Sequence, residues 1–234
     1  MRKQTVDIIE DLVSQLIATF TINNAVDNGN GTFTLFSDCT WWLSIKDTID
    51  ISGSKYEVES FIINVSITIR PLNGALIPVV PTFLLTVPKY IHGTLKMAQN
   101  EIDAINNKTE LVPFVYLYEV IKDRKNTDSE SMIDRNTELR IFFLNSANTS
   151  DWLTDDHYEN VIYPMQQMVD LFIKQIEKNK LFTDNLDYEC LPLLNISEEG
   201  RQENSVFDCN LSGVELRLSA EIRHDLSCEN KCKC

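Results

Sequence analysis

The 234-residue chain has few of the residues and none of the short motifs that are typical of an enzyme. It contains three histidines and seven glycines, and the glycines are scattered. It has no Gly-x-Ser-x-Gly motif for a nucleophilic serine and no glycine-rich loop for a phosphate. It also has no His-x-x-x-His pair that would hold a metal on a helix. We therefore predict no enzymatic activity, no cofactor and no metal.

Basic side chains are also scarce. There are 21 Lys and Arg residues against 35 Asp and Glu residues, so the formal net charge is −14. Proteins that read nucleic acids gain affinity from basic side chains that neutralise phosphates. The composition argues against such a reader and is typical of a protein whose surface repels polyanions.

Long apolar runs are missing as well. No segment reaches the roughly 18 to 20 apolar residues that a membrane-spanning helix needs. The opening sequence MRKQTVDIIEDLVSQL carries Asp7, Glu10 and Asp11 within its apolar stretch, which a secretory signal does not tolerate. We expect no membrane partner and a protein that is made and kept in a cytoplasm.

The six cysteines lack the spacing of a disulfide framework. Three are scattered, and Cys228, Cys232 and Cys234 lie in the last seven residues. In a cytoplasm these thiols are expected to be reduced. Together with His224, the three terminal cysteines offer four soft ligands for zinc. Their spacing matches no common zinc knuckle, so zinc is kept as a minor alternative.

The first 70 residues combine a helical pattern with strand patterns. Residues 5–20 have apolar side chains at helical spacing and acids on the other face, which predicts an amphipathic helix. Short strands around the turn 28–31 (NGNG) predict a β-hairpin. Further short strands over 41–51 and 56–70 suggest a small antiparallel barrel or sandwich. The first predicted region is therefore 1–70, a helix followed by an antiparallel β half.

Trp41 and Trp42 lie within this half and are candidates for a ligand platform. Successive strand residues point to opposite faces of a sheet. We therefore expect one of the two rings in the core and its neighbour on the opposite face.

Residues 71–108 are predicted to form a proline-rich arm and a connector. Four prolines fall between 71 and 90, with little charge, and prolines at this density oppose sheet pairing. Such an apolar segment should be covered by its own domain or by a neighbouring subunit. The connector carries His92 and Gly93, which lack the glycine-rich continuation and the serine motif of an oxyanion loop.

The region 109–224 is expected to be an α/β half. A charged loop over 122–134 separates its first two strands, and Pro164 should kink its long helix. His157 beside Asp155 and Asp156 is a candidate metal corner, but we favour a solvated first helical turn. The predicted strands cover residues 114–121, 139–144 and 214–222, and the helix covers 158–176 after a cap at Thr154. The overall expectation is an α+β protein that ends in a Cys-rich tail, 225–234.

The second half carries a family resemblance. The segments PKYIHGTLKMAQNEIDAI, KTELVPFVYLYEVI and ELRIFFLNSANTSDWLTDDHYENVIYPMQQMVDLFI resemble small virion proteins of Bacteroidetes phages and prophages, those of the crAss-like phages in particular. Residues 109–182 are also similar to the tail-terminator and tail-completion family. There, a strand, a charged loop, a second strand and a long helix build one subunit of a ring. The resemblance covers residues 1–182, and 183–234 depart from it.

The resemblance implies a neck or tail ring that joins the capsid portal to the tail in the virion, assembled in the host cytoplasm. It implies a dodecamer, or a hexamer further down the tail, in contact with other portal, neck and tail ring proteins. Genomic DNA would pass through the channel without specific binding, and the loop 122–134 would face the lumen or a stacked ring. His92 and Gly93 become a structural connector turn. The arm would lie on the next subunit through Leu76, Ile77, Val79, Val80, Phe83, Leu84 and Leu85.

Two other classes of protein are alternatives. A tail accessory or receptor-binding module that binds a glycan or a protein is favoured by the β-rich half and the paired tryptophans. A virion-associated hydrolase is disfavoured because the catalytic motifs are missing.

Overall fold

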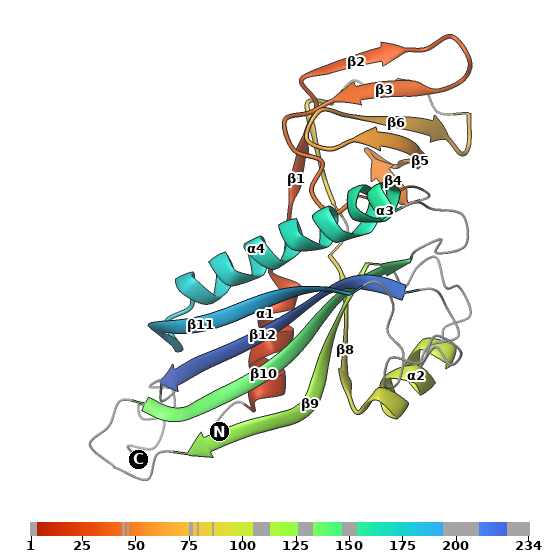
Figure 1. The fold of residues 1–234 in the computed structure, drawn as a ribbon. Coiled ribbons are helices and arrows are strands. Elements are labelled where there is room, and N and C mark those ends of the chain that lie inside the picture. Colours follow the sequence, from red (N-terminus) through yellow and green to blue (C-terminus); the bar gives the residue numbers. More distant parts are fainter. Residues whose placement is uncertain are drawn as a thin grey trace, which may run out of the picture. The chain divides into compact units, whose positions relative to one another are not determined.

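The computed structural model describes residues 4–43, 45, 47–74, 77–78, 80–85, 87–104, 113–125, 133–146, 154–193 and 211–223 (Figure 1). The fold is α+β and consists mostly of strands. The chain divides into two compact units. The first contains Met1–Leu16, Pro88–Ser146 and Val169–Cys234, and the second contains Ile17–Val87 and Ala147–Met168. In the described part of the chain, no helix is long and apolar enough to span a membrane.

The first unit is built on a five-stranded sheet with the order β11-β12-β10-β9-β8. All neighbouring strands are antiparallel except β8 and β9, which are parallel. The strand predicted over 214–222 is confirmed by β12, but buried and more exposed residues alternate only from Leu216 on, because Glu215 is buried as well. The strands are β8 (Lys89–Gly93), β9 (Phe114–Lys125), β10 (Ile133–Ser146), β11 (Phe182–Leu193) and β12 (Leu211–Arg223).

Part of the predicted charged loop 122–134 belongs to strands. Lys122 to Lys125 continue β9, and β10 begins at Ile133, so both strands are longer than predicted. The register explains this, because Lys122, Asp123, Arg124 and Lys125 pair with residues of β10. These polar residues resemble a loop when only the local sequence is considered. Their cross-strand partners nevertheless hold them in the strand ladder.

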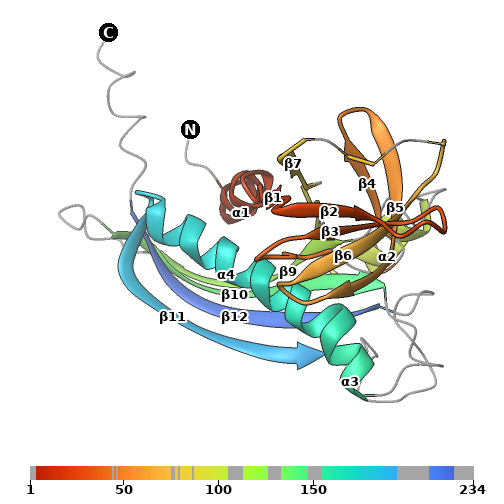
Figure 2. The same ribbon diagram turned by 90° about the horizontal axis from the view of Figure 1, so that it is seen from above.

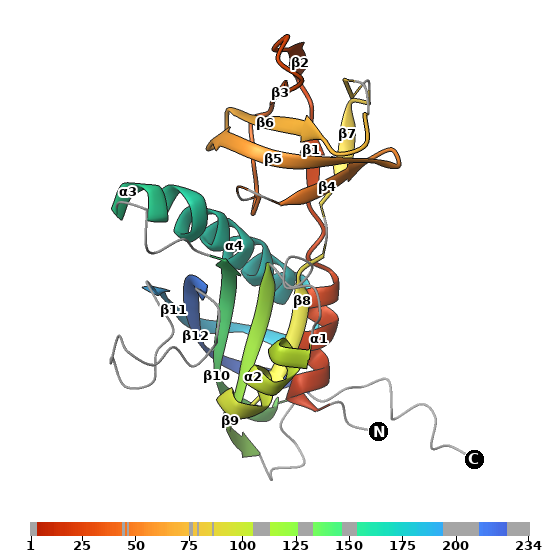
Figure 3. The same ribbon diagram turned by 90° about the vertical axis from the view of Figure 1, so that its right-hand side faces the viewer.

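Helices cover both faces of this sheet. On one face, Ala98 and Ile102 of α2 (Leu95–Ala104) share a buried cluster with Phe114 and Tyr116 of β9. On the other face, Phe143 of β10 meets Phe172 of α4 (Tyr163–Lys178), with ring centroids 5.5 Å apart. The helix α1 (Thr5–Ser14) lies on the same side as α4 (Figure 2), and α2 lies across the opposite face (Figure 3).

The amphipathic N-terminal helix is confirmed, but it is shorter than the predicted 5–20. It ends at Ser14, and the backbone N–H of Gln15 donates to the carbonyl of Leu12. Phe20 belongs to a strand of the second unit, where its ring stacks on Phe83 at 4.8 Å. The predicted division at residue 70 is wrong for this helix, because α1 is grouped with the sheet of the first unit.

The second unit contains an antiparallel sheet with the order β2-β3-β6-β5-β4 and a separate pair, β1-β7. The predicted hairpin around 28–31 is confirmed, because β2 pairs with β3 across this turn. Within the described residues, β2 and β4 are edge strands that do not pair with each other, so the sheet is open and the predicted barrel is not formed. The strands are β1 (Thr19–Thr21), β2 (Asn24–Asp27), β3 (Phe33–Phe36), β4 (Thr48–Ile51), β5 (Ser54–Ile62), β6 (Ser66–Pro71) and β7 (Thr82–Leu84).

The expectation that prolines keep residues 71–90 out of a sheet is wrong. Thr82 to Leu84 form β7, which pairs with β1, and Pro81 and Pro88 lie outside this strand. No backbone N–H is therefore lost from the ladder. The carbonyl of Pro81 instead accepts a hydrogen bond from the N–H of Ile22 at 2.7 Å. At this point the segment packs on its own unit.

The long helix has the interruption that Pro164 predicts. Helix α3 (Thr154–His157) runs into a π-helical turn (Tyr158–Ile162) and then into α4. Proline has no N–H to donate to the carbonyl four residues before it. Just ahead of it, the N–H of Tyr163 donates to the carbonyl of Tyr158, five residues back. The helix thus accommodates the proline with a wider, π-helical hydrogen bond just before it.

Candidate functional site

The predicted connector turn at His92 and Gly93 is a strand end. Both residues belong to β8, and they pair with Leu117 and Tyr118 of the parallel strand β9. The carbonyl of Gly93 accepts a hydrogen bond from the Tyr116 hydroxyl at 3.0 Å. Gly93 has a φ of 129°, a backbone conformation that side chains rarely adopt, and the chain turns into α2 directly after it. The turn prediction was wrong because it ignored this pairing partner, which is distant in sequence.

His92 forms a polar pair but lies in no catalytic constellation among the described residues. Its Nδ1 lies 2.6 Å from Oε1 of Glu119, and both side chains are partly exposed. The neighbouring Tyr90 donates its hydroxyl proton to the carbonyl of Val6 in α1. Burial, together with nearby carboxylates, raises the pKa of Tyr90 above its ordinary value. These contacts hold β8 against α1 and β9.

The other candidate positions concern metal binding. His157 is buried, and burial lowers the pKa of its imidazole. The expected solvated corner is therefore wrong for His157, although Asp155 and Asp156 are exposed. No group of three or more His, Cys, Asp or Glu side chains in the described part of the chain is arranged to hold a metal. The zinc alternative at the C-terminus lies outside the described residues.

The two adjacent tryptophans differ as expected, although residues 41–43 form a turn rather than the predicted strand. Trp42 is only 2% exposed and belongs to the core. Trp41 is half-buried, and its indole N–H donates to the carbonyl of Thr19 at 3.0 Å. Both rings are therefore part of the scaffold of the second unit.

The predicted arm residues have three different environments. Phe83 and Leu85 are 7% and 4% exposed, so they belong to the core of the second unit. Leu84, between them, is 64% exposed. Ile77 and Val80 are half-buried. Two further predicted arm residues, Leu76 and Val79, lie outside the described residues.

The most developed polar surface is on the first unit, on the face of the sheet that α2 covers only in part. We call it the charged face. It has two adjoining hollows of about 400 and 380 Å³ that share Lys122, Glu138, Asp187 and Ser219. Its charged side chains are Lys122 and Arg124 of β9, Glu138 and Arg140 of β10, Glu215, Arg217 and Glu221 of β12, and Asp187 and Glu189 of β11.

Glu215 lies at the centre of this face, where the polar part meets the cluster under α2. Its side chain is 4% exposed, and Oε1 accepts hydrogen bonds from Nε of Arg140 at 2.6 Å and Nε of Arg217 at 3.0 Å. Burial raises the pKa of this carboxyl. The two arginines outweigh burial through their hydrogen bonds and charges, so the pKa lies below its ordinary value.

Aromatic rings position one of these arginines. The guanidinium of Arg140 lies 5.7 Å from the ring centroid of Tyr118 and 5.6 Å from that of Phe142. Such cation–π contacts hold a guanidinium in a fixed orientation. Arg140 thus bridges the buried carboxylate and the aromatic cluster under α2.

Several other charged side chains of this face also have polar partners. Nζ of Lys122 lies 2.8 Å from Glu138, and Nη1 of Arg217 lies 3.7 Å from Glu189. Thr183 and Asn185 of β11 donate hydrogen bonds to the carboxylate of Glu221. A face on which cations and carboxylates alternate is suited to contact with another protein surface. It is poorly suited to a polyanion, which needs unpaired cations.

We expect Glu215→Gln to lower the free energy of unfolding of the first unit by about 1–2 kcal/mol at neutral pH. It replaces two charge-assisted hydrogen bonds with neutral ones in a buried site. Because the pKa of Glu215 is lowered on folding, its contribution is present above the ordinary carboxyl range and is lost as the pH falls. The difference between wild type and variant should therefore shrink in acid.

Urea unfolding measured across pH tests this expectation. Glu138→Gln is the matched control, because its carboxylate is exposed and pairs with Lys122, and it should change stability little. Equal effects of the two substitutions would contradict the role given to Glu215.

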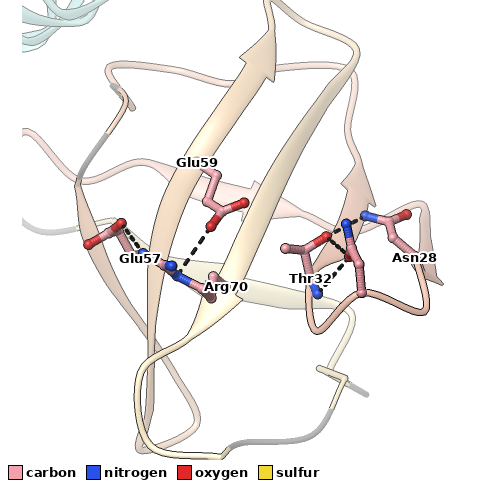
Figure 4. Close-up of polar contacts among 6 residues, drawn as sticks. Asn28, Thr32, Glu57, Glu59 and Arg70 are labelled. Carbon is pink, nitrogen blue, oxygen red and sulfur yellow. Dashed lines mark hydrogen bonds and ion pairs between the residues drawn. The ribbon is translucent and has the colours of Figure 1, made fainter.

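The second unit has polar contacts of a different kind (Figure 4). Arg70 of β6 contacts Glu57 at 2.9 Å and Glu59 at 3.1 Å, both on the neighbouring strand β5. At the β2–β3 turn, the side-chain amide of Asn28 donates to the hydroxyl of Thr32 at 2.9 Å. These contacts join neighbouring strands or close a hairpin, so they serve the fold.

The charged face was missed from sequence. The alternation of Glu215, Arg217, Ser219 and Glu221 in β12 was visible, but it indicates only one solvent-facing side. The burial of Glu215 depends on Arg140, 75 residues away in the chain.

Comparisons with protein-family models, curated proteins and solved structures found no match to this chain.

Proposed function

We propose that the chain is a structural subunit of a neck or tail ring of a tailed phage, connecting the capsid portal to the tail, with no catalytic role. The observation that carries this proposal is the element order of the first unit. Two long antiparallel strands, β9 and β10, are followed in the chain by the helix α3–α4. This is the order expected of a tail-terminator-like ring subunit.

The charge distribution supports a protein that surrounds DNA without binding it. The net charge is −14, and three cations of the charged face, Lys122, Arg140 and Arg217, lie within 3.0 Å of a carboxylate. Affinity for DNA comes mainly from unpaired Lys and Arg that release phosphate counterions. A wall of this composition lets the genome pass without holding it, whether the ring is a dodecamer or a hexamer.

Imaging of intact virions that contain the chain tests the proposal. With a tag on the chain, we expect density in a ring around the DNA channel, between the portal and the tail. Finding the chain only in peripheral fibres or spikes would rule the proposal out. A monomer in dilute solution is compatible with it, because the portal can act as the template for assembly.

A second candidate, a tail accessory module that binds another protein, is favoured by one feature of the second unit. Phe36, Ile62 and Val65 are large apolar side chains that remain exposed. They lie at one end of the sheet, where the N–H of Val65 donates to the carbonyl of Ile62, and the carbonyl of Val65 accepts from Ser37. Grouped exposed apolar side chains are typical of a protein contact. The same imaging decides between the two functions.

A further inference from the structure

Within the part of the chain that the structure describes, the sheet of the first unit is open at both sides. Strand β11 pairs with β12 on one side, and no described strand pairs with it on the other. At the opposite side, β8 pairs with β9 only over residues 114–118. Within the described residues, the later part of β9 therefore also has an unpaired side. Such edges present backbone N–H and C=O groups that another strand can pair with.

The two edges carry opposite charge. On β9, the exposed residues 122–125 include Lys122, Arg124 and Lys125, and we call them the basic edge. On β11, residues 184–189 include Asp184, Asp187 and Glu189 and no basic residue, and we call them the acidic edge. The one acid of the basic edge, Asp123, already faces Arg135 and Thr5 of its own unit.

The strand directions allow these edges to meet. From β9 through β10 and β12 to β11, each neighbouring pair is antiparallel, so β9 and β11 run in opposite directions. If a second copy continues the sheet, its β11 is antiparallel to β9 of the first copy. Lys122, Glu138, Ser219 and Asp187 form one cross-strand row, so Lys122 and Arg124 lie on the same face as Asp187 and Glu189.

We propose that the basic edge of one copy pairs with the acidic edge of the next copy as antiparallel strands. In the register that matches the charges, Lys122 lies opposite Glu189 and Arg124 lies opposite Asp187. This proposal rests on the proposed ring and identifies its subunit contact. Pro192 lacks an N–H, so the pairing ends before it.

The charges of the two edges also determine which kind of symmetry relates neighbouring copies. Pairing two acidic edges would place carboxylates opposite each other, and pairing two basic edges would do the same with cations, which is unfavourable in a sheet. Contact between unlike edges is head-to-tail, and such contacts form closed rings when the rotation between copies allows it.

Charge reversal in two variants tests the pairing. Lys122→Glu with Arg124→Glu makes both edges of a copy acidic, and Asp187→Lys with Glu189→Lys makes both edges basic. Each variant alone should associate at least about tenfold more weakly than wild type, because attraction becomes repulsion at two cross-strand pairs. An equimolar mixture should regain assembly, since each copy then meets an oppositely charged edge on both sides.

Mass photometry and sedimentation measure these associations. The control Lys96→Glu with Lys174→Glu makes the same change in net charge as the first variant, at exposed positions of α2 and α4, and should associate like wild type. Association of the wild type should also weaken between about 0.1 M and 1 M salt, where the Debye length falls from about 10 Å to about 3 Å. Variants that assemble like wild type, or a mixture that does not recover, would overturn the proposal.

Zero-length carbodiimide coupling of the wild-type chain gives a second readout that detects weak association. In a mixture of ¹⁴N- and ¹⁵N-labelled protein, an amide from Lys122 to Glu189 or Asp187 should join peptides of different isotope. The Lys122–Glu138 pair, 2.8 Å apart within one copy, is the internal control and should couple peptides of the same isotope. No mixed-isotope product at high protein concentration would overturn the edge pairing.

The experiments separate this inference from the proposed function. If virion imaging shows the ring but the coupling finds other contacts, the edge pairing is wrong and the ring stands. If the edges couple but the chain lies in peripheral fibres, the contact is right and the proposed function is wrong.

Discussion

Replacing Gly213 with alanine is expected to lower the stability of the first unit by about 3 kcal/mol or more. Gly213 lies in β12, between Leu144 of β10 and Leu193 of β11. A Cβ at this position would overlap the carbonyl oxygen of Phe143 and lie 2.9 Å from the carbonyl carbon. The obstacle is backbone in the middle of the sheet, so no side-chain rotation relieves it.

Hydrogen exchange of peptides from β10 and β12 measures this effect. Ser219→Ala is the control, because it adds no atom to an exposed position on the same strand. We expect fast exchange in the Gly213 variant and near wild-type protection in the control. Equal protection in the two variants would show that the sheet tolerates a side chain at residue 213.

The second large effect is expected at Phe83. Its ring is 7% exposed and stacks on Phe20 with centroids 4.8 Å apart. Removing it leaves a cavity in the core of the second unit, and Phe→Ala changes at such sites cost about 3–5 kcal/mol. Urea unfolding followed by tryptophan fluorescence suits this unit, because Trp42 is buried in it.

Leu84→Ala is the matched control, one residue further along β7. Leu84 is 64% exposed, so its removal should change stability by less than about 0.5 kcal/mol. If Leu84 contacts a neighbouring subunit, as first predicted for the arm, its removal should weaken assembly and leave folding intact. A Phe83 variant as stable as wild type would restore the view of the whole segment as an arm.

The local sequence pattern was sufficient to predict those helices and strands that bury one of their faces. The spacing of Ile9, Leu12 and Val13 predicted α1, and the alternation from Val214 to Ile222 predicted β12. Each element buries the side chains that its own period aligns, so neighbours in sequence carry the signal. The turn 28–31 and an interruption of the long helix near Pro164 were also predicted, because glycine and proline restrict the backbone locally.

Pairing partners far apart in the chain could not be predicted in this way. His92 and Gly93 resemble a turn until β9 is placed beside them. Thr82 to Leu84 resemble an extended arm until β1 pairs with them, and residues 122–125 resemble a loop until β10 does. Strand formation depends on hydrogen bonds to another strand, and that strand is not visible in the local pattern.

The sequence alone determined the mixed α+β composition, the acidic surface and the apolar faces of the elements, because these follow from residue types and their spacing. The tertiary structure decided which elements share a sheet and therefore where charges gather. It buried Glu215 between two arginines and placed the basic end of β9 and the acidic strand β11 on opposite sides of one sheet. Those positions depend on the register between paired strands whose residues are up to 90 positions apart, as Ile133 and Arg223 are, and register is set by packing and backbone pairing over the whole sheet.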